Sequence, residues 1–522
     1  MFEKGDILRF FYGWILGRPM NFSFIDEFVS GSAGPLRNTL AYDYDVIIAG
    51  GGMSGLITAS AIGAYSKQKA RILVVDRNSP DDPGKKTING WTCGDAVSKR
   101  SVDYIFDNIG IKYSTPELEH PVEGVLVYSP DHETKVLFEG EGFILNRKIL
   151  PKRQVEDAKK LGVEFAFGVA CDRLYSEDGF IRGVTGRNLK DGSEFKKTAK
   201  MVVDAAGNAT KLRPNLPIES KIELDIDRDD LESTGRYIFD FESGEEDPTW
   251  FDPKYALIHL DQIASPGGYL WTFPKGKNKV NIGLGVQKKA LDARNAKLGK
   301  KDGLQDLIDQ YVKMNRSIKN PVQSTNPEDS GNTKGSWQVS VRRHNDCLVA
   351  NGYALVGDAA WMARPIDAGG IGPSIYASVM LGKVVAEAIE ANDTSEGSLW
   401  PYNLEYMKHH GYQMASFEVL RRYLQTLSNE QIDYGMKYFL SEEDISSITN
   451  REHPKFSRLR LLNPAMMMRI AKEPKLASGL KHTSDVSEEL ISHNMNYPES
   501  PSGFEVWKKK LHSILSNAFA KF

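Results

Sequence analysis

The stretch YDVIIAGGGMSG at Tyr44–Gly55 decides the fold of this chain. Its first half, Tyr44–Ala49, is a short apolar run with β-branched residues, which is typical of a buried parallel strand. Glycines follow in the pattern Gly-x-Gly-x-x-Gly at Gly50, Gly52 and Gly55, and a helical run begins directly after them. Such a turn lets the backbone approach a pyrophosphate, whose charge then lies at the helix N-terminus.

A second strand and an acidic residue complete this pattern. Ile72–Val75 is again apolar, and Asp76 follows it directly. A carboxylate at the end of the second strand accepts hydrogen bonds from a ribose hydroxyl. The order of strand, glycine turn, helix, strand and acid therefore predicts a dinucleotide-binding domain of the Rossmann type.

Charge and cysteine usage limit the classes of partner. The 522 residues carry a formal net charge of −3, which gives no indication of nucleic-acid binding. Cys93, Cys171 and Cys347 are far apart in the sequence, so we expect neither a disulfide framework nor a zinc or iron–sulfur site. This usage is typical of a reducing compartment.

The apolar runs are too short to span a bilayer. The longest aromatic run near the start, FFYGWIL at Phe10–Leu16, follows Glu3 and Asp6 and lacks a small-residue cleavage site, so we expect no secretory signal. Residues 1–40 either lie on a membrane or cover the domain, and general burial favours covering. We predict a cytoplasmic protein, with peripheral contact at the inner face of the membrane left open.

A second constellation lies late in the chain. Tyr353–Val356 reads as a strand that ends at Gly357 and Asp358, and Gly369–Pro373 opens a long helix. A carboxylate at a strand end can bind a ribitol or ribose hydroxyl, and the helix N-terminus would stabilise the negative charge of a reduced flavin. With another strand-to-glycine turn at Val202–Gly207, these features predict bound FAD.

The order of these patterns predicts an α/β chain with a β-rich, α+β insert. A second Gly-x-Gly-x-x-Gly after a strand is absent, so we expect no dedicated nicotinamide domain. The predicted parts are an N-terminal extension at 1–40, a discontinuous Rossmann-type FAD-binding domain at 41–214 and 346–394, a β-rich substrate-binding domain at 215–345 and a helical C-terminal region at 395–522.

These turns together resemble the flavoprotein superfamily that includes the aromatic ring hydroxylases. Within it, Cys93-Gly94, the PxxYxWxFPxG segment at Pro266–Gly276 and the GGIGP turn at Gly369–Pro373 resemble the geranylgeranyl reductase family, over about residues 43–400. The resemblance implies FAD and the saturation of isoprenoid double bonds, on archaeal-type membrane ether lipid precursors or on the side chain of chlorophyll. It also implies an external electron donor, either reduced ferredoxin or NAD(P)H.

The resemblance implies a set of FAD contacts beyond the glycines of the first turn. They are Ser54, Asp76, Cys93, Gly94, Arg147, Ala170, Asp358, Gly370 and Ile371. The chain departs from the family by its N-terminal extension and its enlarged C-terminal region. These departures leave the exact lipid substrate open more than they affect the flavin.

The segment YLWTFP at Tyr269–Pro274 alternates aromatic residues, so Tyr269, Trp271 and Phe273 would share one face of a strand. The pattern alone favours sheet core, whereas the family resemblance favours a groove that binds a polyprenyl chain. A similar segment occurs in flavin-dependent halogenases, so an FAD-dependent monooxygenase or halogenase is the alternative function. Ring hydroxylases tend to have a histidine where Trp361 stands here.

Cys93 is the candidate proton donor of the predicted reductase. An isolated alkene has no carbonyl to accept a hydride, so its reduction needs a proton at the other carbon. A thiol with an ordinary pKa of about 8.5 is mostly protonated at neutral pH. The alternatives are a proton relayed by water and a cysteine that only packs against the flavin.

The last twenty residues carry an apolar stripe at helical spacing. Its members are Phe504, Trp507, Leu511, Ile514, Leu515, Ala518, Phe519 and Phe522, with Lys508, Lys509, Lys510 and Lys521 on the other side. Such a helix can lie in an anionic membrane interface, or it can pack on the core of the protein. The sequence leaves both interpretations open.

Overall fold

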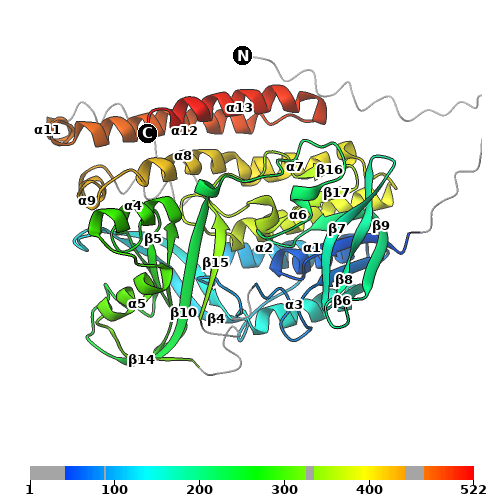
Figure 1. The fold of residues 1–522 in the computed structure, drawn as a ribbon, viewed down its shortest axis with the longest axis horizontal. Helices are drawn as coiled ribbons and strands as arrows, with labels where there is room; N and C mark the ends of the chain where they lie inside the picture. The colour runs from blue at the N-terminus through cyan, green and yellow to red at the C-terminus, as the bar shows by residue number, and fades with distance from the viewer. Residues whose placement is uncertain (1–41, 87–89, 325–333, 441–463) are drawn as a thin grey trace, which may run out of the picture. The chain divides into compact units, whose positions relative to one another are not determined.

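Two β-sheets organise the chain in the computed structural model, which describes residues 42–86, 90–324, 334–440 and 464–522 (Figure 1). The predicted N-terminal extension at 1–40 therefore lies outside the described residues. The first sheet follows the order β16-β17-β9-β1-β2-β6. Its strands are β1 (Tyr44–Ala49), β2 (Ile72–Asp76), β6 (Val163–Phe167), β9 (Glu194–Asp204), β16 (Val349–Ala350) and β17 (Tyr353–Leu355).

The centre of this first sheet is parallel. Strand β1 pairs in parallel with β2 and β9, and β17 pairs in parallel with β9. The apolar run that opens the motif is buried from Asp45 to Ala49, as expected for a strand covered on both faces. Strands β7 (Val169–Glu177) and β8 (Phe180–Asn188) extend β9 with antiparallel pairing.

Helices cover the first sheet and pack closely on one another. They include α1 (Met53–Tyr65), α2 (Lys99–Ile109), α3 (Ile149–Lys160) and α6 (Ile371–Glu390). Gly382 of α6 lies against Ala61 of α1, where an added Cβ would overlap the alanine side chain. This close crossing brings the N-termini of α1 and α6 to the same side of the sheet, as Gly357 beside Ser54 also shows.

The second sheet is antiparallel apart from one pair, β4 with β11, and follows the order β14-β10-β13-β12-β11-β4-β5-β3, with β15 on β10. Its strands come from both sides of residue 215. They are β3 (Ala96–Ser98), β4 (Leu118–Tyr128), β5 (Lys135–Leu145), β10 (Leu231–Ser243), β11 (Tyr255–His259), β12 (Leu270–Pro274), β13 (Lys279–Gln287), β14 (Ile318–Gln323) and β15 (Lys334–Ser340).

The two faces of the second sheet have different neighbours. One face packs on α5 (Leu304–Met314), whose Leu304 and Ile308 lie against Gly235 of β10. Helix α4 (Lys288–Leu298) follows β13. The other face carries Trp271 and Phe273 and contacts the turn at Gly94. That second face therefore looks toward the residues that the sequence assigns to the flavin.

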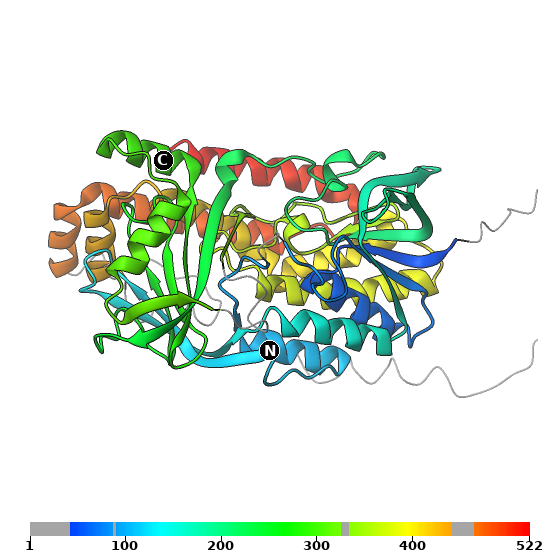
Figure 2. The ribbon, with the colours of Figure 1, turned by 60° about the horizontal axis from the view of Figure 1, so that its bottom comes forward.

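The C-terminal region is helical, as the sequence predicts (Figures 1 and 2). Its helices are α7 (Glu396–His409), α8 (Met414–Leu424), α9 (Asn429–Tyr438), α11 (Pro464–Lys472), α12 (Pro474–Met495) and α13 (Phe504–Phe519). Along α13, Phe504, Trp507 and Leu511 are buried, and the Trp507 ring lies 4.6 Å from that of Tyr497. The apolar stripe is therefore covered by the chain itself, which favours packing over a membrane-lying helix. Within the described residues, no helix has the length and hydrophobicity that crossing a bilayer requires.

Candidate active site

The carboxyl ends of the parallel strands meet at one edge of the first sheet. Ala49 of β1 pairs with Val75 of β2 and with Asp204 of β9, and Asp204 pairs with Leu355 of β17. The two glycine turns and both acids that the sequence singled out, Asp76 and Asp358, therefore lie at the carboxyl ends of β1, β2 and β17 in the parallel centre of this sheet. Open α/β sheets bind nucleotides at this edge.

The glycines of the first turn have different roles. Gly50 has a φ of +111°, and a Cβ there would overlap the carbonyl oxygen of Ala205. A Cβ at Gly55 would overlap the carbonyl oxygen of Gly50, so both positions require glycine for the fold itself. A Cβ at Gly52, by contrast, would meet no atom within 4 Å. The turn therefore leaves the backbone open at Gly52, where a phosphate would approach the start of α1.

Asp76 is fully engaged by the protein. Its Oδ2 accepts hydrogen bonds from the backbone N–H of Gly51 at 2.7 Å and of Gly84 at 3.0 Å. Its Oδ1 accepts from the backbone N–H and the side-chain amide of Asn78, at 2.7 and 2.8 Å. Burial raises the pKa of this carboxyl, against the effect of these donors. A ribose hydroxyl would have to replace one of them, and the Gly84 donor lies on the loop that also contacts Gly52.

Asp358 has a different environment. It lies in the short 3-10 helix Gly357–Ala360, and Lys86 Nζ donates to its Oδ2 at 2.8 Å. Lys86, helped by Arg147, holds the pKa of Asp358 below its ordinary value. A Cβ at Gly370 would lie 3.5 Å from Asp358 Oδ1, so the carboxylate stands beside the start of α6.

The remaining FAD contacts implied by the sequence lie around these two turns. A Cβ at Gly357 would overlap Ser54 Oγ, and Ile371 opens α6 directly after Gly370. Ala170 lies on β7 next to Cys171, whose thiol has a raised pKa through burial and the nearby Asp204, Asp172 and Asp76. The structure thus brings Ala170 to the same sheet edge from another strand.

Arg147 is buried and has an unsatisfied donor. Its Nε has no hydrogen-bond partner among the described residues. Buried polar groups are almost always paired, so this donor points to a missing partner with oxygen or nitrogen acceptors. Arg147 acts electrostatically on both Asp358 and Cys93. Together with the open backbone at Gly52, the orphaned donor fits a bound flavin nucleotide.

Cys93 is half-buried close to this arginine. Its Sγ accepts a hydrogen bond from the Asp95 backbone N–H at 3.3 Å. Desolvation raises the pKa of the thiol, although Arg147 and Lys86 act in the opposite direction. The thiol is therefore protonated at neutral pH. Its position allows it to hold a proton rather than to act as a thiolate nucleophile.

The aromatic strand β12 lies against the Cys93–Gly94 turn. A Cβ at Gly94 would come within 2.7 Å of the Phe273 ring, so glycine is required for this contact. Trp271 Nε1 donates to Asn281 Oδ1 at 3.0 Å, and Tyr269 Oη donates to the Asp367 carbonyl at 2.6 Å. Trp271 and Phe273 also belong to an apolar cluster with Ala256 and Ile144. They are core residues of the sheet and, on the same face, neighbours of the candidate site.

A buried polar cluster around Lys275 lies beneath the Cys93 turn and was not predicted from the sequence. Lys275 is fully buried, with its Nζ 2.7 Å from Glu119 Oε2 and 3.7 Å from Asp95 Oδ2. Asn281 donates from Nδ2 to the Cys93 carbonyl at 2.9 Å and to Asp95 Oδ2 at 3.0 Å. The signal available in the sequence was a lysine directly after an aromatic strand, which reads as an ordinary solvated residue.

The comparisons with known sequences agree on one family. A family model described as the geranylgeranyl reductase catalytic domain matches residues 230–324. The digeranylgeranylglycerophospholipid reductase of Sulfolobus acidocaldarius is 32% identical over 481 residues, which cover 91% of this chain and 97% of that protein. The protein of the same name from Methanosarcina acetivorans is 28% identical over 400 residues, 75% of this chain and 87% of the relative.

Solved structures share the fold. A geranylgeranyl bacteriochlorophyll reductase-like protein from Thermoplasma acidophilum aligns with a TM-score of 0.65 at 22% identity, over 84% of this chain and 99% of that one. The FAD-dependent myxobacterial chondrochloren halogenase aligns with a TM-score of 0.58 at 18% identity, over 87% and 96%. These likenesses confirm the α/β fold class that the sequence predicts.

Proposed function

The chain belongs to the family of digeranylgeranylglycerophospholipid reductases, and we propose that it saturates the double bonds of geranylgeranyl chains on archaeal-type membrane ether lipid precursors, using bound FAD. The relatives confirm the family resemblance that the motifs indicated. The observation that carries the proposal is the meeting of three features at one place: the turn open at Gly52, the Asp358 turn beside α6, and an aromatic strand against Cys93.

The residues that would hold FAD come from the strand ends of the first sheet. The turn at Gly52 and the N-terminus of α1 would bind the pyrophosphate, and Asp76 would bind the adenosine ribose. Asp358 would bind the ribitol chain. The N–H groups at the start of α6, from Ile371 onward, would lie near the ring and favour its reduced, negatively charged form. When bound, FAD supplies the hydride that alkene reduction needs.

The chain itself supplies the proton and the surroundings. Cys93 holds a proton on a thiol whose pKa is raised by burial, and Arg147 and Lys86 beside it limit that increase. Trp271 and Phe273 present aromatic faces on the same side of β12, which can ease positive charge that develops on the substituted carbon of the alkene. Tyr269 ties this strand to the loop before α6 through the Asp367 carbonyl.

The electron donor, the membrane contact and the compartment complete the proposal. An external donor, reduced ferredoxin or NAD(P)H, would reduce the flavin, because the sequence shows one dinucleotide fingerprint. The lipid substrate requires access to a membrane, so we infer peripheral contact at its cytoplasmic face. The chain would otherwise be cytoplasmic.

The test is a turnover experiment under anaerobic conditions. The FAD-loaded protein is reduced with dithionite and incubated with a geranylgeranylated glycerophospholipid, and the products are weighed by mass spectrometry. We expect a gain of two hydrogens for each double bond reduced, together with reoxidation of the flavin without oxygen. A product that forms only with oxygen, or that contains oxygen or halogen, would support the monooxygenase or halogenase alternative.

A further inference from the structure

Trp361 directly follows the turn that carries Asp358 and is held in an unusual way. The side chain is fully buried, and the residue has a left-handed backbone with φ of +58°. The guanidinium carbons of Arg213 and Arg342 lie 4.1 and 4.6 Å from the centre of a Trp361 ring. A left-handed conformation costs a bulky residue free energy, so the surroundings must compensate for it. Two desolvated cation–π contacts are able to do so.

The backbone of the same turn is held by the same neighbours. Arg213 Nε donates to the Ala359 carbonyl at 3.0 Å, and the Asn345 N–H donates to the Ala360 carbonyl at 2.9 Å. The Met362 N–H donates to the Gly357 carbonyl at 3.2 Å. The position of Asp358 is therefore fixed from outside the turn, by Arg213 and by the segment that precedes β16.

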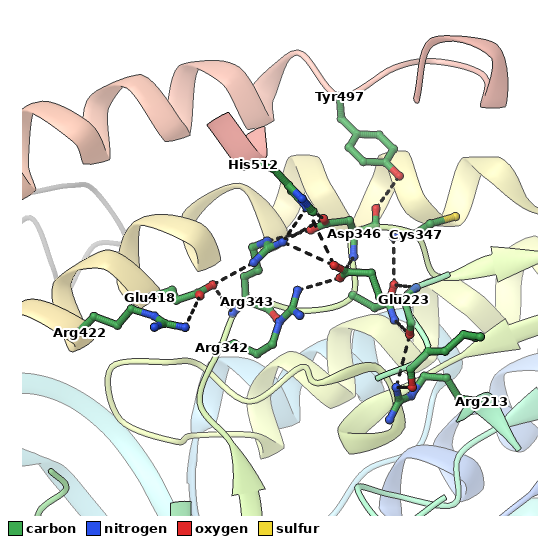
Figure 3. A network of polar contacts seen from close by, with 12 residues as sticks. Arg213, Glu223, Arg342, Arg343, Asp346, Cys347, Glu418, Arg422, Tyr497 and His512 are labelled. Atoms are coloured by element: carbon green, nitrogen blue, oxygen red, sulfur yellow. Dashed lines mark hydrogen bonds and ion pairs between the residues drawn. The ribbon is translucent and has the colours of Figure 1, made fainter. Parts of the chain in front are cut away.

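Arg342, one of the two arginines over Trp361, belongs to a buried ion network (Figure 3). Arg342 Nη2 donates to Glu223 Oε2 at 2.8 Å. The next residue, Arg343, makes a two-pronged contact with Asp346, from Nε to Oδ1 at 2.8 Å and from Nη2 to Oδ2 at 3.0 Å. Ion pairs thus hold both ends of the segment from residue 342 to residue 346.

The C-terminal helices supply the outer members of this network, as Figure 3 shows. Glu418 of α8 accepts from the Arg343 N–H at 3.0 Å. His512 of α13 places Nε2 at 2.8 Å from Asp346 Oδ2, and Tyr497 donates to the Asp346 carbonyl at 2.9 Å. A chain of contacts therefore runs from α8 and α13 through residues 342–346 to the Asp358 turn.

Glu223, Asp346 and His512 offer three ligand atoms within 4.8 Å of one another, which raises the question of a metal ion. The Arg343 guanidinium already lies among them, with Nη2 at 3.0 Å from Asp346, 3.1 Å from His512 and 3.8 Å from Glu223. A divalent cation next to a fixed guanidinium would meet strong repulsion. The cluster therefore reads as a structural ion network.

We propose that Trp361 is a positioning residue for the Gly357–Ala360 turn that carries Asp358. We also propose that the C-terminal helices fix the position of Trp361 through Arg342. This inference rests on the proposed binding of FAD, and it gives the enlarged C-terminal region a role at the active site. The aromatic face is the essential part of the side chain, rather than the indole N–H, because Nε1 has no hydrogen-bond partner among the described residues. Phenylalanine should therefore replace it, whereas an aliphatic residue should not.

The experiment compares FAD binding by Trp361→Leu, Trp361→Phe and the wild type. Each purified apoprotein is titrated with FAD, and the visible spectrum of the bound flavin is recorded. Trp361→Leu loses both cation–π contacts, and we expect it to bind FAD about tenfold more weakly and with a shifted spectrum. Trp361→Phe should bind within about threefold of the wild type with an unchanged spectrum.

A matched control separates positioning from loss of stability. Trp250 stacks on His259 at 5.3 Å on the α5 side of the second sheet, so Trp250→Leu is the same substitution at a tryptophan away from the Asp358 turn. This variant should melt earlier but retain the FAD affinity and spectrum of the wild type. If Trp250→Leu weakens FAD as much as Trp361→Leu does, the effect is general destabilisation and the proposal fails.

The role of the network is tested with Arg342→Lys, which keeps the charge but loses the planar group that stacks and forks. We expect it to weaken FAD binding by several-fold, and the double variant with Trp361→Leu to be little worse than Trp361→Leu alone. Additive losses would show that the two residues act separately and would overturn the coupling. A wild type that does not bind FAD would instead refute the proposed function, so the two failures are distinct.

Discussion

The two strand-end carboxylates of the first sheet, Asp76 and Asp358, which we propose bind sugar hydroxyls of FAD, have different surroundings. Asp76 accepts four hydrogen bonds from protein N–H groups, three of them in the backbone, and burial raises its pKa. Asp358 is held by one flexible cation, Lys86, and its pKa is lowered. The first acid therefore also stabilises its own turn, and a ribose hydroxyl would have to replace one of its four donors. The second is a group whose partner can be exchanged for a ligand.

The glycines of the first turn show the same contrast between a structural position and one open to a ligand. Substitutions of these glycines have the largest expected effects. Gly55→Val puts side-chain atoms onto the Gly50 carbonyl and should cost more than about 3 kcal/mol, leaving little folded protein. Gly52→Trp places its Cβ in open space, so it should fold with a melting temperature near that of the wild type yet remain colourless. Circular dichroism and flavin absorbance check both; a yellow Gly52→Trp protein would contradict the assignment of the pyrophosphate.

Asparagine variants of the two acids test the comparison itself. Asp76→Asn places an amide where four donors converge, so at least one buried donor loses its acceptor. The free energy of unfolding of the apoprotein, measured in urea, should fall by roughly 2 kcal/mol. Asp358→Asn leaves a half-buried lysine that can reach water, and its main effect should be on FAD affinity. Equal losses of apoprotein stability in the two variants would show that both acids are structural.

A third carboxyl, that of Glu232 on β10, is also buried, and its effect on stability should depend on pH. It accepts one hydrogen bond from Gln425, and desolvation raises its pKa from 4.5 to about 7. The folded chain therefore binds this proton more tightly than the unfolded chain, and stability is lost as the pH rises from about 4.5 through 7. Glu232→Gln should be more stable than the wild type at pH 8 by roughly 3 kcal/mol and equal to it near pH 4.

Urea unfolding at the two pH values measures this difference. The opposite case is Glu418 in the ion network, where desolvation is outweighed by four arginines that bring the pKa down to about 2. Glu418→Gln should therefore lose stability near neutral pH, where Glu232→Gln gains it. A Glu232→Gln protein whose advantage does not depend on pH would show that the carboxyl is not protonated in the folded state.

The smallest effect on stability is expected at Cys93, the candidate proton donor. Cys93→Ala and Cys93→Ser should both keep FAD and fold normally, because the side chain is half-buried and small. Single-turnover reoxidation of the reduced enzyme by lipid should slow by about 100-fold in the alanine variant, the lower end of what one general acid contributes. Reduction of the lipid by Cys93→Ala at the wild-type rate would make the thiol a packing group.

The local geometry of the two glycine turns could be predicted from the sequence. A glycine that must accept a positive φ, a strand of β-branched residues and an acid at a strand end are each consequences of a few neighbouring residues, so Gly50, Asp76 and Asp358 were found without a structure. The helical C-terminal region was found for the same reason. Periodicity could not say what its apolar stripe covers, because a membrane and a protein core select the same pattern.

Only the tertiary structure decided which distant residues share one environment. Strands β3 to β5 joined the second sheet from before residue 215, and Lys275 became a fully buried partner of Asp95. Trp361 acquired two arginines from separate segments, and His512 reached an ion network that is 166 residues away in sequence at Asp346. Burial and ion pairing depend on packing between elements that are far apart along the chain, and no local pattern in the sequence records that packing.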